Sequence, residues 1–332
     1  MSTSNHVTNI AIVGAGGRSG KFIAEALIGT GKHKVTAISR ADSTSAMPDG
    51  LHGVKKIDYD DTKSMVEALK GQEVLIVTMG VMAPKDTQKK LIDAAVEAEV
   101  PWIMPNEWGG DPNGNSNPQL ATDTMIGAGV VAIRDYIKSA GGDKTHYVSL
   151  ANGFWYEFSL AGTEARYGFD FEKKSVTFYD EGEGYITTST FPQVGRAVAK
   201  LLSLKVLPED DNDKSVCLSQ WKNGTVYVKS FRITQKDMLA SVLRVTGDKE
   251  EDWTITHEDV ESRYKRGVQM MQKGDFVGFG ILLYARYFFK DVSASKEREV
   301  DNEKLGLPEE SLDEATEVAV GMAKRGENNA IH

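Results

Sequence analysis

The turn at residues 14–20 limits the possible folds of this chain more than any other feature. Its sequence, GAGGRSG, directly follows the apolar run Asn9–Val13 and opens the amphipathic stretch Gly20–Thr30. A G-x-x-G-x-x-G pattern between a strand and a helix is typical of a Rossmann domain, where the glycines allow a tight turn, close approach of a pyrophosphate and close helix packing. No Gly-Lys-Ser/Thr closes the motif, which excludes a nucleotide-triphosphate P-loop. We therefore expect a dinucleotide to be bound by Gly14, Gly16, Gly17, Arg18, Ser19 and Gly20.

The first half of the chain alternates short apolar runs with amphipathic stretches, as repeated β-α-β units do. Strands are predicted at Asn9–Val13, Lys34–Ile38, Val54–Ile57, Val74–Thr78, Trp102–Met104 and His146–Leu150. Helices are predicted at Gly20–Thr30, Thr62–Lys70, Pro84–Ala98 and Gln119–Ala140. Strands that are nearly unbroken apolar runs indicate burial on both faces. The pattern predicts an α/β fold with a Rossmann-type, doubly wound parallel sheet over residues 1–152.

The composition and pattern of the sequence change after residue 152. Aromatic residues cluster in GFWYEFSL, and the stretches that follow are mainly amphipathic. Helices are predicted at Gln193–Ser203, Gln235–Thr246, His257–Lys273 and Phe276–Phe289. We expect residues 153–332 to form a smaller, mostly helical α/β lobe for the substrate, which is free to interleave with the first domain.

The residues at the end of the second predicted strand distinguish NAD from NADP as the cofactor. An acidic residue there bonds the ribose hydroxyls of NAD, whereas basic and hydroxyl groups accept the additional phosphate of NADP. The residues present are Ser39 and Arg40, with Arg18 as a further donor, so the sequence favours NADP(H). Asp42, two residues further on, keeps NAD open as an alternative.

Composition excludes several classes of function. The net charge of −9 and the absence of a basic run argue against a nucleic-acid partner. The single cysteine, Cys217, favours a reducing compartment, and the start of the chain lacks a signal peptide, so a cytoplasmic protein is expected. The apolar run from Val277 to Phe289 is too short for a membrane span. The histidines show no metal-ligand spacing, and no metal is expected.

Several sequence motifs, and their order along the chain, resemble those of the NmrA-like, isoflavone-reductase-like branch of the atypical short-chain dehydrogenases, particularly its fungal members. They are GAGGRSG, LIDAAVEAEVPWIMPNEWGGDP, VSLANGF, FPQVGRAVAKLL and GDFVGFGILLYARYF. The resemblance implies that Thr78, Met79 and Gly80 line the adenosine side of the cofactor. It also implies that Asn106, Glu107, Asn152 and Phe154 surround the nicotinamide.

One departure from the family concerns the chemistry. Reductases of this family carry a lysine at a position that falls near Val130, and this sequence has none there. A carbonyl reduction needs a proton donor at the developing alkoxide. We expect the catalytic residues to be Glu107, Tyr156 or Asp111, unless the reaction needs little acid–base help, as in reduction of an iminium ion.

Four aromatic residues are expected to contact the substrate: Trp108, Phe154, Trp155 and Tyr156. Aromatic walls supply a large contact area with few rotatable bonds. Closure of the core between the lobes explains the same residues equally well.

The resemblance implies an NADP(H)-dependent oxidoreductase acting on a hydrophobic secondary metabolite, nitrogen-containing as in an alkaloid, or aromatic. A cyclisation or isomerisation mediated by bound NADP is a variant of this expectation. The alternative from another class is a non-catalytic NAD(P)-sensing regulator that binds a protein partner. A monomer or a homodimer is expected.

Overall fold

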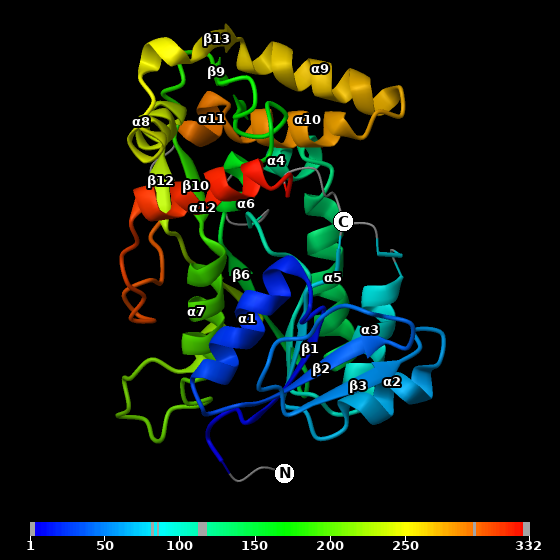
Figure 1. The fold of residues 1–332 in the computed structure, drawn as a ribbon. Helices are drawn as coiled ribbons and strands as arrows, with labels where there is room; N and C mark the ends of the chain where they lie inside the picture. The colour runs from blue at the N-terminus through cyan, green and yellow to red at the C-terminus, as the bar shows by residue number, and fades with distance from the viewer. Residues whose placement is uncertain (1–3, 81–82, 85, 112–117, 295–296, 328–332) are drawn as a thin grey trace.

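The computed structural model describes residues 4–80, 83–84, 86–111, 118–294 and 297–327, which form two lobes (Figure 1). The first lobe contains a seven-stranded sheet in the order β11-β6-β5-β4-β1-β2-β3, with every neighbouring pair parallel. Its strands are β1 (Asn9–Val13), β2 (Lys34–Arg40), β3 (Gly53–Ile57), β4 (Val74–Val77), β5 (Trp102–Met104), β6 (His146–Ala151) and β11 (Gly224–Tyr227). The predicted Rossmann fold is confirmed.

Helices cover both faces of this sheet. On one face, α1 (Arg18–Gly29) and α7 (Phe191–Leu202) pack against alternate side chains of the strands, such as Ile10 and Ile12. On the other face, α2 (Thr62–Leu69), α3 (Thr87–Glu97) and α5 (Gly127–Gly141) contact the intervening side chains, such as Ala11 and Val13. Because successive side chains of a strand point to opposite faces, burial of all of them requires a doubly wound sheet.

After the boundary predicted at residue 152, the chain returns twice from the second lobe to the first. Strand β11, which the sequence analysis did not predict, returns from the second half and pairs with β6. Helix α7 was assigned to the second lobe, but it packs on α1, where a Cβ at Gly195 would lie 2.5 Å from the carbonyl oxygen of Phe22. Two parts of the second half therefore complete the first lobe.

The second lobe has two small sheets and seven α-helices within the described ranges. Its strands are β7 (Phe154–Trp155), β8 (Phe169–Asp170), β9 (Ser175–Tyr179), β10 (Ile186–Ser189), β12 (Phe231–Ile233) and β13 (Thr254–Glu258). Its helices are α4 (Pro118–Asp123), α6 (Tyr156–Leu160), α8 (Gln235–Thr246), α9 (Val260–Gln272), α10 (Val277–Tyr287), α11 (Lys290–Ser293) and α12 (Leu312–Lys324). Two 3-10 turns lie at Leu218–Trp221 and Glu250–Asp252.

Three predicted helices differ from the observed ones. The stretch predicted at Gln119–Ala140 is divided between α4 and α5 at Met125, whose φ of 62° no helix accommodates. His257 lies in strand β13, and α9 starts three residues later after the capping residue Asp259. Helix α3 begins at Thr87, and Lys85 of the helix predicted from Pro84 lies outside the described residues. No helix in the described ranges has the length and apolar character required to cross a bilayer.

Candidate functional site

The glycine turn has the close contacts that require glycine. A Cβ at Gly14, where φ is +85°, would lie 2.1 Å from the carbonyl oxygen of Thr78, and one at Gly20 would lie 2.1 Å from that of Gly14. The exposed Gly17 is different, since the nearest atom to an added Cβ is the Gly14 oxygen at 3.1 Å. Helix α1 starts at Arg18 with no side-chain cap and no acidic residue in its first turn. The turn thus leaves a positively polarised helix end open to an anion.

The end of β2 lies next to this turn. Gly16 packs against the loop after β2, because a Cβ there would lie 2.5 Å from the carbonyl oxygen of Ala46. Ser39 is buried, whereas the side chain of Arg40 is 64% exposed, and its Nε lies 3.6 Å from an oxygen of Asp42. A contact so long and so exposed leaves the guanidinium able to turn towards a phosphate.

Arg18 is held towards the second lobe. Its guanidinium carbon lies 4.7 Å from the centroid of the Phe158 ring, and Nη2 donates to the backbone oxygen of Glu327 at 3.3 Å. Ser19, the next residue of α1, is half-buried. Arg40 is therefore the guanidinium at the end of β2, and Arg18 lies between the turn and the second lobe.

The loops after β4, β5 and β6 lie along the same edge of the sheet as the glycine turn. The Thr78 hydroxyl donates to the backbone of β1. Asn106 accepts a hydrogen bond from the N–H of Met79 and donates one to its carbonyl oxygen, both at 3.1 Å, and the adjacent Gly80 is exposed. Asn152 is fully buried, yet its Oδ1 has no hydrogen-bond partner among the described residues. An orphaned acceptor of this kind is costly unless a bound group satisfies it.

A buried charge cluster lies beyond β5. Arg134 on α5 donates from Nε to both carboxylate oxygens of Glu107 at 3.0 Å, and from Nη1 to Asp111 at 2.8 Å. These three side chains are only 4–6% exposed. The hydroxyl of Ser149 donates to Glu107, and that of Tyr227 donates to Asp111. The cluster therefore holds two carboxylates around one guanidinium.

Burial controls the protonation of this cluster. It raises the pKa of Glu107, although the charge of Arg134 and the hydrogen bonds from Ser149 and Arg134 oppose the shift. It also raises the pKa of Tyr227 to about 12, with the hydrogen bond to Asp111 acting in the same direction. Tyr227 is consequently a neutral hydroxyl at physiological pH.

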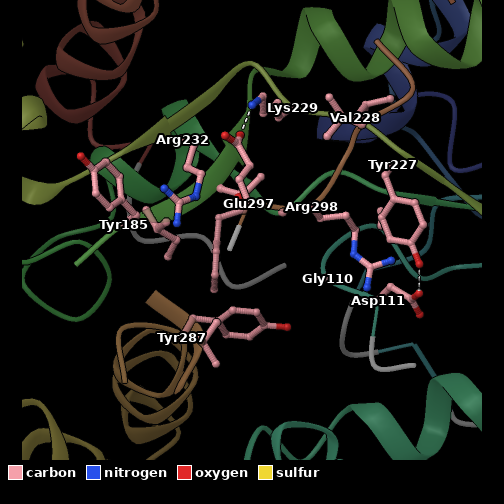
Figure 2. A pocket seen from close by; sticks show the side chains of 17 residues that line it. Gly110, Asp111, Tyr185, Tyr227, Val228, Lys229, Arg232, Tyr287, Glu297 and Arg298 are labelled. Carbon is pink, nitrogen blue, oxygen red and sulfur yellow. Dashed lines mark hydrogen bonds and ion pairs between the residues drawn. The ribbon is translucent and has the colours of Figure 1, made fainter. Parts of the chain in front are cut away.

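A cavity of about 140 Å³ lies next to the cluster, between the two lobes (Figure 2). Its lining includes four aromatic rings and five charged side chains: Phe154, Tyr185, Tyr227, Tyr287, Asp111, Lys229, Arg232, Glu297 and Arg298. Asp111 and Tyr227 come from the carboxyl ends of the sheet, where Rossmann folds bind their ligands.

The structure brings only some of the predicted catalytic and substrate residues to this cavity. Asp111 and Phe154 line it, and Glu107 does not. Tyr156 was predicted as a catalytic and substrate-binding residue, but it is fully buried in the core of the second lobe, with its hydroxyl 2.6 Å from that of Thr316.

The two predicted tryptophan contacts also fall elsewhere. Trp108 packs on the first core and donates from Nε1 to the backbone of Val77 at 2.8 Å. Trp155 stacks on Phe191 at 4.6 Å between ring centroids. Of the predicted aromatic wall, only Phe154 therefore faces the cavity, and the other three rings close the protein interior.

The position at which the resemblance places a lysine is close to the site. Val130 lines a smaller cavity of about 20 Å³ together with Gly110 and Tyr287, both of which also line the larger one. Nowhere in the described ranges do three or more His, Cys, Asp or Glu side chains gather as they would around a metal ion.

The sequence analysis missed Arg134 and Tyr227. One signal for Arg134 was available: it falls at helical spacing with Gly127, Ile137 and Gly141, which form the buried face of α5. An arginine on a buried face requires carboxylate partners. Tyr227 carried no signal, because the strand that positions it was not predicted.

Comparison with known proteins finds similarity to a family model and to proteins named as an oxidoreductase and a reductase homolog. The model of the NmrA-like family matches residues 6–164. The oxidoreductase aprR of Aspergillus flavus is 28% identical over 315 residues, 92% of this chain and 96% of that protein. The isoflavone reductase homolog P3 of Arabidopsis thaliana is 32% identical over 163 residues, 45% of this chain and 50% of that protein.

Solved structures share the fold over almost the entire chain. The structure of AtPrR2 with NADP+ and (+)pinoresinol superposes with a TM-score of 0.71 at 18% identity, covering 95% of this chain and 99% of that one. The similarity of fold therefore includes the second lobe, which lies largely outside the residues that the family model matches.

Proposed function

Because this chain is NmrA-like over residues 6–164, we propose that it is an NADP(H)-dependent oxidoreductase of a hydrophobic small molecule. The observation that carries the proposal is the juxtaposition of a glycine turn shaped for a pyrophosphate and an aromatic cavity at the same edge of the sheet. The name of aprR, an oxidoreductase related over nearly the entire chain, supports the reaction type. The NADP+ in the structure of AtPrR2 supports the cofactor.

The residues present fit NADP(H). Gly14, Gly16, Gly17, Ser19 and Gly20 would hold the pyrophosphate, and Ser39 and Arg40 the 2′-phosphate. Thr78, Met79 and Gly80 would line the adenosine side. Asn106, Asn152 and Phe154 would surround the nicotinamide, where the orphaned Oδ1 of Asn152 offers an acceptor. When bound, the cofactor supplies or accepts a hydride.

The proton chemistry belongs to Asp111 and Tyr227 in this proposal. The Tyr227 hydroxyl lies in the cavity and donates to Asp111, so its oxygen can accept a proton from a substrate hydroxyl while its own proton passes to the carboxylate. The reverse transfer serves a reduction. Arg134 fixes Asp111, and Glu107 acts through Arg134 as a positioning residue. A cyclisation or isomerisation would use the same residues, and the cavity beside them favours an enzyme over a sensor.

Selectivity between cofactors tests the proposal. Titration followed by tryptophan fluorescence should show that NADPH binds more tightly than NADH. Arg40→Ala should weaken NADPH binding by about 10- to 100-fold and leave NADH binding unchanged, because a charge-assisted hydrogen bond contributes roughly 1.5–3 kcal/mol.

Lys34→Ala is the matched control, since Lys34 is the exposed residue at the opposite end of β2. This variant should bind both cofactors as the wild type does. Equal affinities of the wild type for NADPH and NADH, or an unchanged preference in Arg40→Ala, would contradict the NADP(H) assignment.

A further inference from the structure

The hydroxyl of Tyr287 reaches the cavity from the second lobe. Tyr287 is the last residue of α10, and its ring meets that of Phe154 edge to face, with the ring centroids 5.0 Å apart. It lines the cavity, and Figure 2 shows its hydroxyl directed towards the side that Gly110 and Asp111 form. Because this phenol comes from α10 and that of Tyr227 from β11, the two hydroxyls enter the cavity from different lobes.

Gly110 provides the space for this hydroxyl. A Cβ at Gly110 would lie 2.4 Å from the hydroxyl oxygen of Tyr287 and 3.2 Å from its Cζ. The φ of Gly110 is not positive, so the close contact, and not the backbone conformation, requires glycine here. The Tyr227 hydroxyl donates to the next residue, Asp111. The two hydroxyls therefore contact neighbouring residues, whose Cα atoms are about 3.8 Å apart.

The position of Tyr287 is fixed by the residue before it. The buried Arg286 donates from Nε to Asp123 of α4 at 2.6 Å. It also donates from Nη1 and Nη2 to the two carboxylate oxygens of Asp291 on α11, at 3.0 and 2.8 Å. The end of α10 that carries Tyr287 is thus attached to two other helices. A side chain held in this way is organised for a ligand before the ligand binds.

The hydroxyl of Tyr287 has a proton to donate. Burial raises the pKa of Tyr287 to about 12, and the charge of Asp111 acts in the same direction, so the phenol is neutral at physiological pH. Its oxygen makes no hydrogen bond with any described residue. The Tyr227 hydroxyl already gives its proton to Asp111, which leaves its oxygen as an acceptor. The cavity therefore offers a ligand one phenolic donor and one phenolic acceptor.

We infer that the substrate is an alcohol or the corresponding carbonyl compound, and that Tyr287 is a catalytic residue that donates a hydrogen bond to its oxygen. The inference rests on the proposed function, whose substrate it specifies. An alcohol hydroxyl donates one hydrogen bond, which the Tyr227 oxygen accepts, and its lone pair accepts the proton of Tyr287. An iminium ion, which the sequence analysis considered, has no oxygen and would leave the Tyr287 donor without an acceptor.

The hydrogen bond from Tyr287 acts on the charge that develops on this oxygen. In the oxidation, the hydroxyl proton of the substrate passes to Tyr227, and the proton of Tyr227 passes to Asp111. The electron pair of the broken O–H bond forms the second bond of the carbonyl, while the hydride leaves the carbon for NADP+. Tyr287 keeps its own proton and stabilises the partly negative oxygen. In the reduction the same transfers run in reverse.

Calorimetric titration of the NADP+-saturated protein tests the inference with three probes: phenol, anisole and benzene. A cavity of about 150 Å³ holds one benzene ring, and this one, at about 140 Å³, is close to that size. Phenol presents a donor and an acceptor, anisole an acceptor alone, and benzene neither. Phenol has no hydrogen on the carbon that bears its hydroxyl, so no hydride transfer accompanies binding. Phenol should bind more tightly than anisole, and anisole more tightly than benzene, by about 3- to 10-fold at each step.

Removal of one hydroxyl identifies the donor. Tyr287→Phe keeps the ring and should weaken binding of phenol and of anisole by about 3- to 10-fold, with benzene and NADP+ bound as in the wild type. Tyr185→Phe is the matched control, because Tyr185 also lines the cavity and its hydroxyl is directed away from it in Figure 2. This variant should bind all three probes as the wild type does.

The possible failures are distinguishable. Absence of NADP+ binding would remove the proposed function itself. If NADP+ binds and phenol does not, or if the three probes bind equally, the substrate class is wrong. If Tyr287→Phe binds phenol and anisole as the wild type does, or loses benzene to the same extent, its hydroxyl is not the donor. An equal loss in Tyr185→Phe would overturn the assignment to Tyr287 as well.

Discussion

At the scale of single residues, Gly17 is a position at which a substitution can block cofactor binding and leave the fold intact. Its backbone is extended, with φ −79° and ψ 171°, so valine can adopt the same conformation. The branched side chain would occupy the space that a pyrophosphate needs. We expect Gly17→Val to lose about 100-fold or more in NADPH affinity, measured by fluorescence titration, with an unchanged circular dichroism spectrum.

Gly29→Val provides the comparison at the other end of α1. Gly29 has no atom within 4 Å of an added Cβ, so the variant carries the same side chain without blocking the turn. It should bind NADPH normally. Retained NADPH binding in a folded Gly17→Val protein would place the dinucleotide elsewhere.

The difference between Gly20 and Arg134 shows which site residues the sequence could reveal. The glycines lie together in the turn between β1 and α1, so their spacing alone indicates their role, although Gly14 also contacts the distant Thr78. Arg134 acts through Glu107, Asp111 and, indirectly, Tyr227, which lie far from it in sequence. Such a cluster exists only after the sheet has brought its loops together, and no local pattern encodes it.

At the scale of elements, α9 and α10 depend on a glycine contact. A Cβ at Gly278 would lie 2.5 Å from the carbonyl oxygen of Gly267 and 2.9 Å from the backbone nitrogen of Met271. Backbone atoms cannot move aside without separating the helices. Gly278→Ala should therefore lower the free energy of unfolding by about 1–3 kcal/mol in urea denaturation.

Gly280→Ala, two residues further along α10, is the matched control. Its added Cβ would meet only the Ala165 oxygen at 3.6 Å, which is an ordinary contact. Alanine is the better helix former, so this variant should be unchanged or more stable by up to about 1 kcal/mol. Equal stabilities of the two variants would mean that the helices do not require close contact at Gly278.

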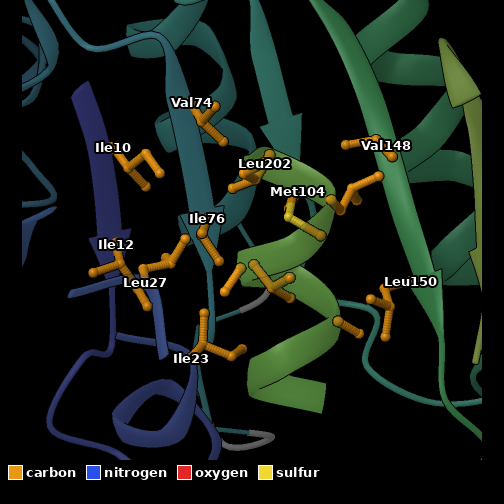
Figure 3. Packing of buried hydrophobic residues seen from close by; sticks show 14 of the residues in the cluster. Ile10, Ile12, Ile23, Leu27, Val74, Ile76, Met104, Val148, Leu150 and Leu202 are labelled. Carbon is orange, nitrogen blue, oxygen red and sulfur yellow. The ribbon is translucent and has the colours of Figure 1, made fainter. Parts of the chain in front are cut away.

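Helix α7 illustrates what the sequence could not predict about elements. Its amphipathic pattern predicted a helix at Gln193–Ser203, close to the observed Phe191–Leu202. The pattern says that one face is buried, but not against which partner. Leu202 in fact lies over β4 and β5, near Ile76 and Met104 (Figure 3). The partner is set by the path of the intervening chain through the second lobe, which has no local signature.

At the scale of the whole molecule, Glu157 joins the two lobes. It lies on α6 of the second lobe, and its carboxylate accepts hydrogen bonds from the backbone N–H of Phe191, the first residue of α7, at 3.1 and 3.2 Å. Burial raises the pKa of Glu157 to about 7, although the hydrogen bond from Phe191 opposes the shift. The nearby Glu310 adds to the increase.

This raised pKa makes the stability of the molecule depend on pH. The folded state holds the proton of Glu157 more tightly than the unfolded state, whose carboxyl titrates near 4.5. The free energy of unfolding should therefore fall as the pH rises from about 4.5 to 7 and stay level above that range, by up to roughly 3 kcal/mol from this group. Gln resembles the protonated carboxyl of Glu157 and still accepts the hydrogen bond from the Phe191 N–H.

In urea denaturation, Glu157→Gln should thus be more stable than the wild type at pH 8 and close to it at pH 4.5. Glu317→Gln, which changes an exposed carboxylate on α12, should differ from the wild type by the same small amount at both pH values. If Glu157→Gln shows that same constant difference, Glu157 does not titrate at the junction, and the pH dependence of the fold has another source.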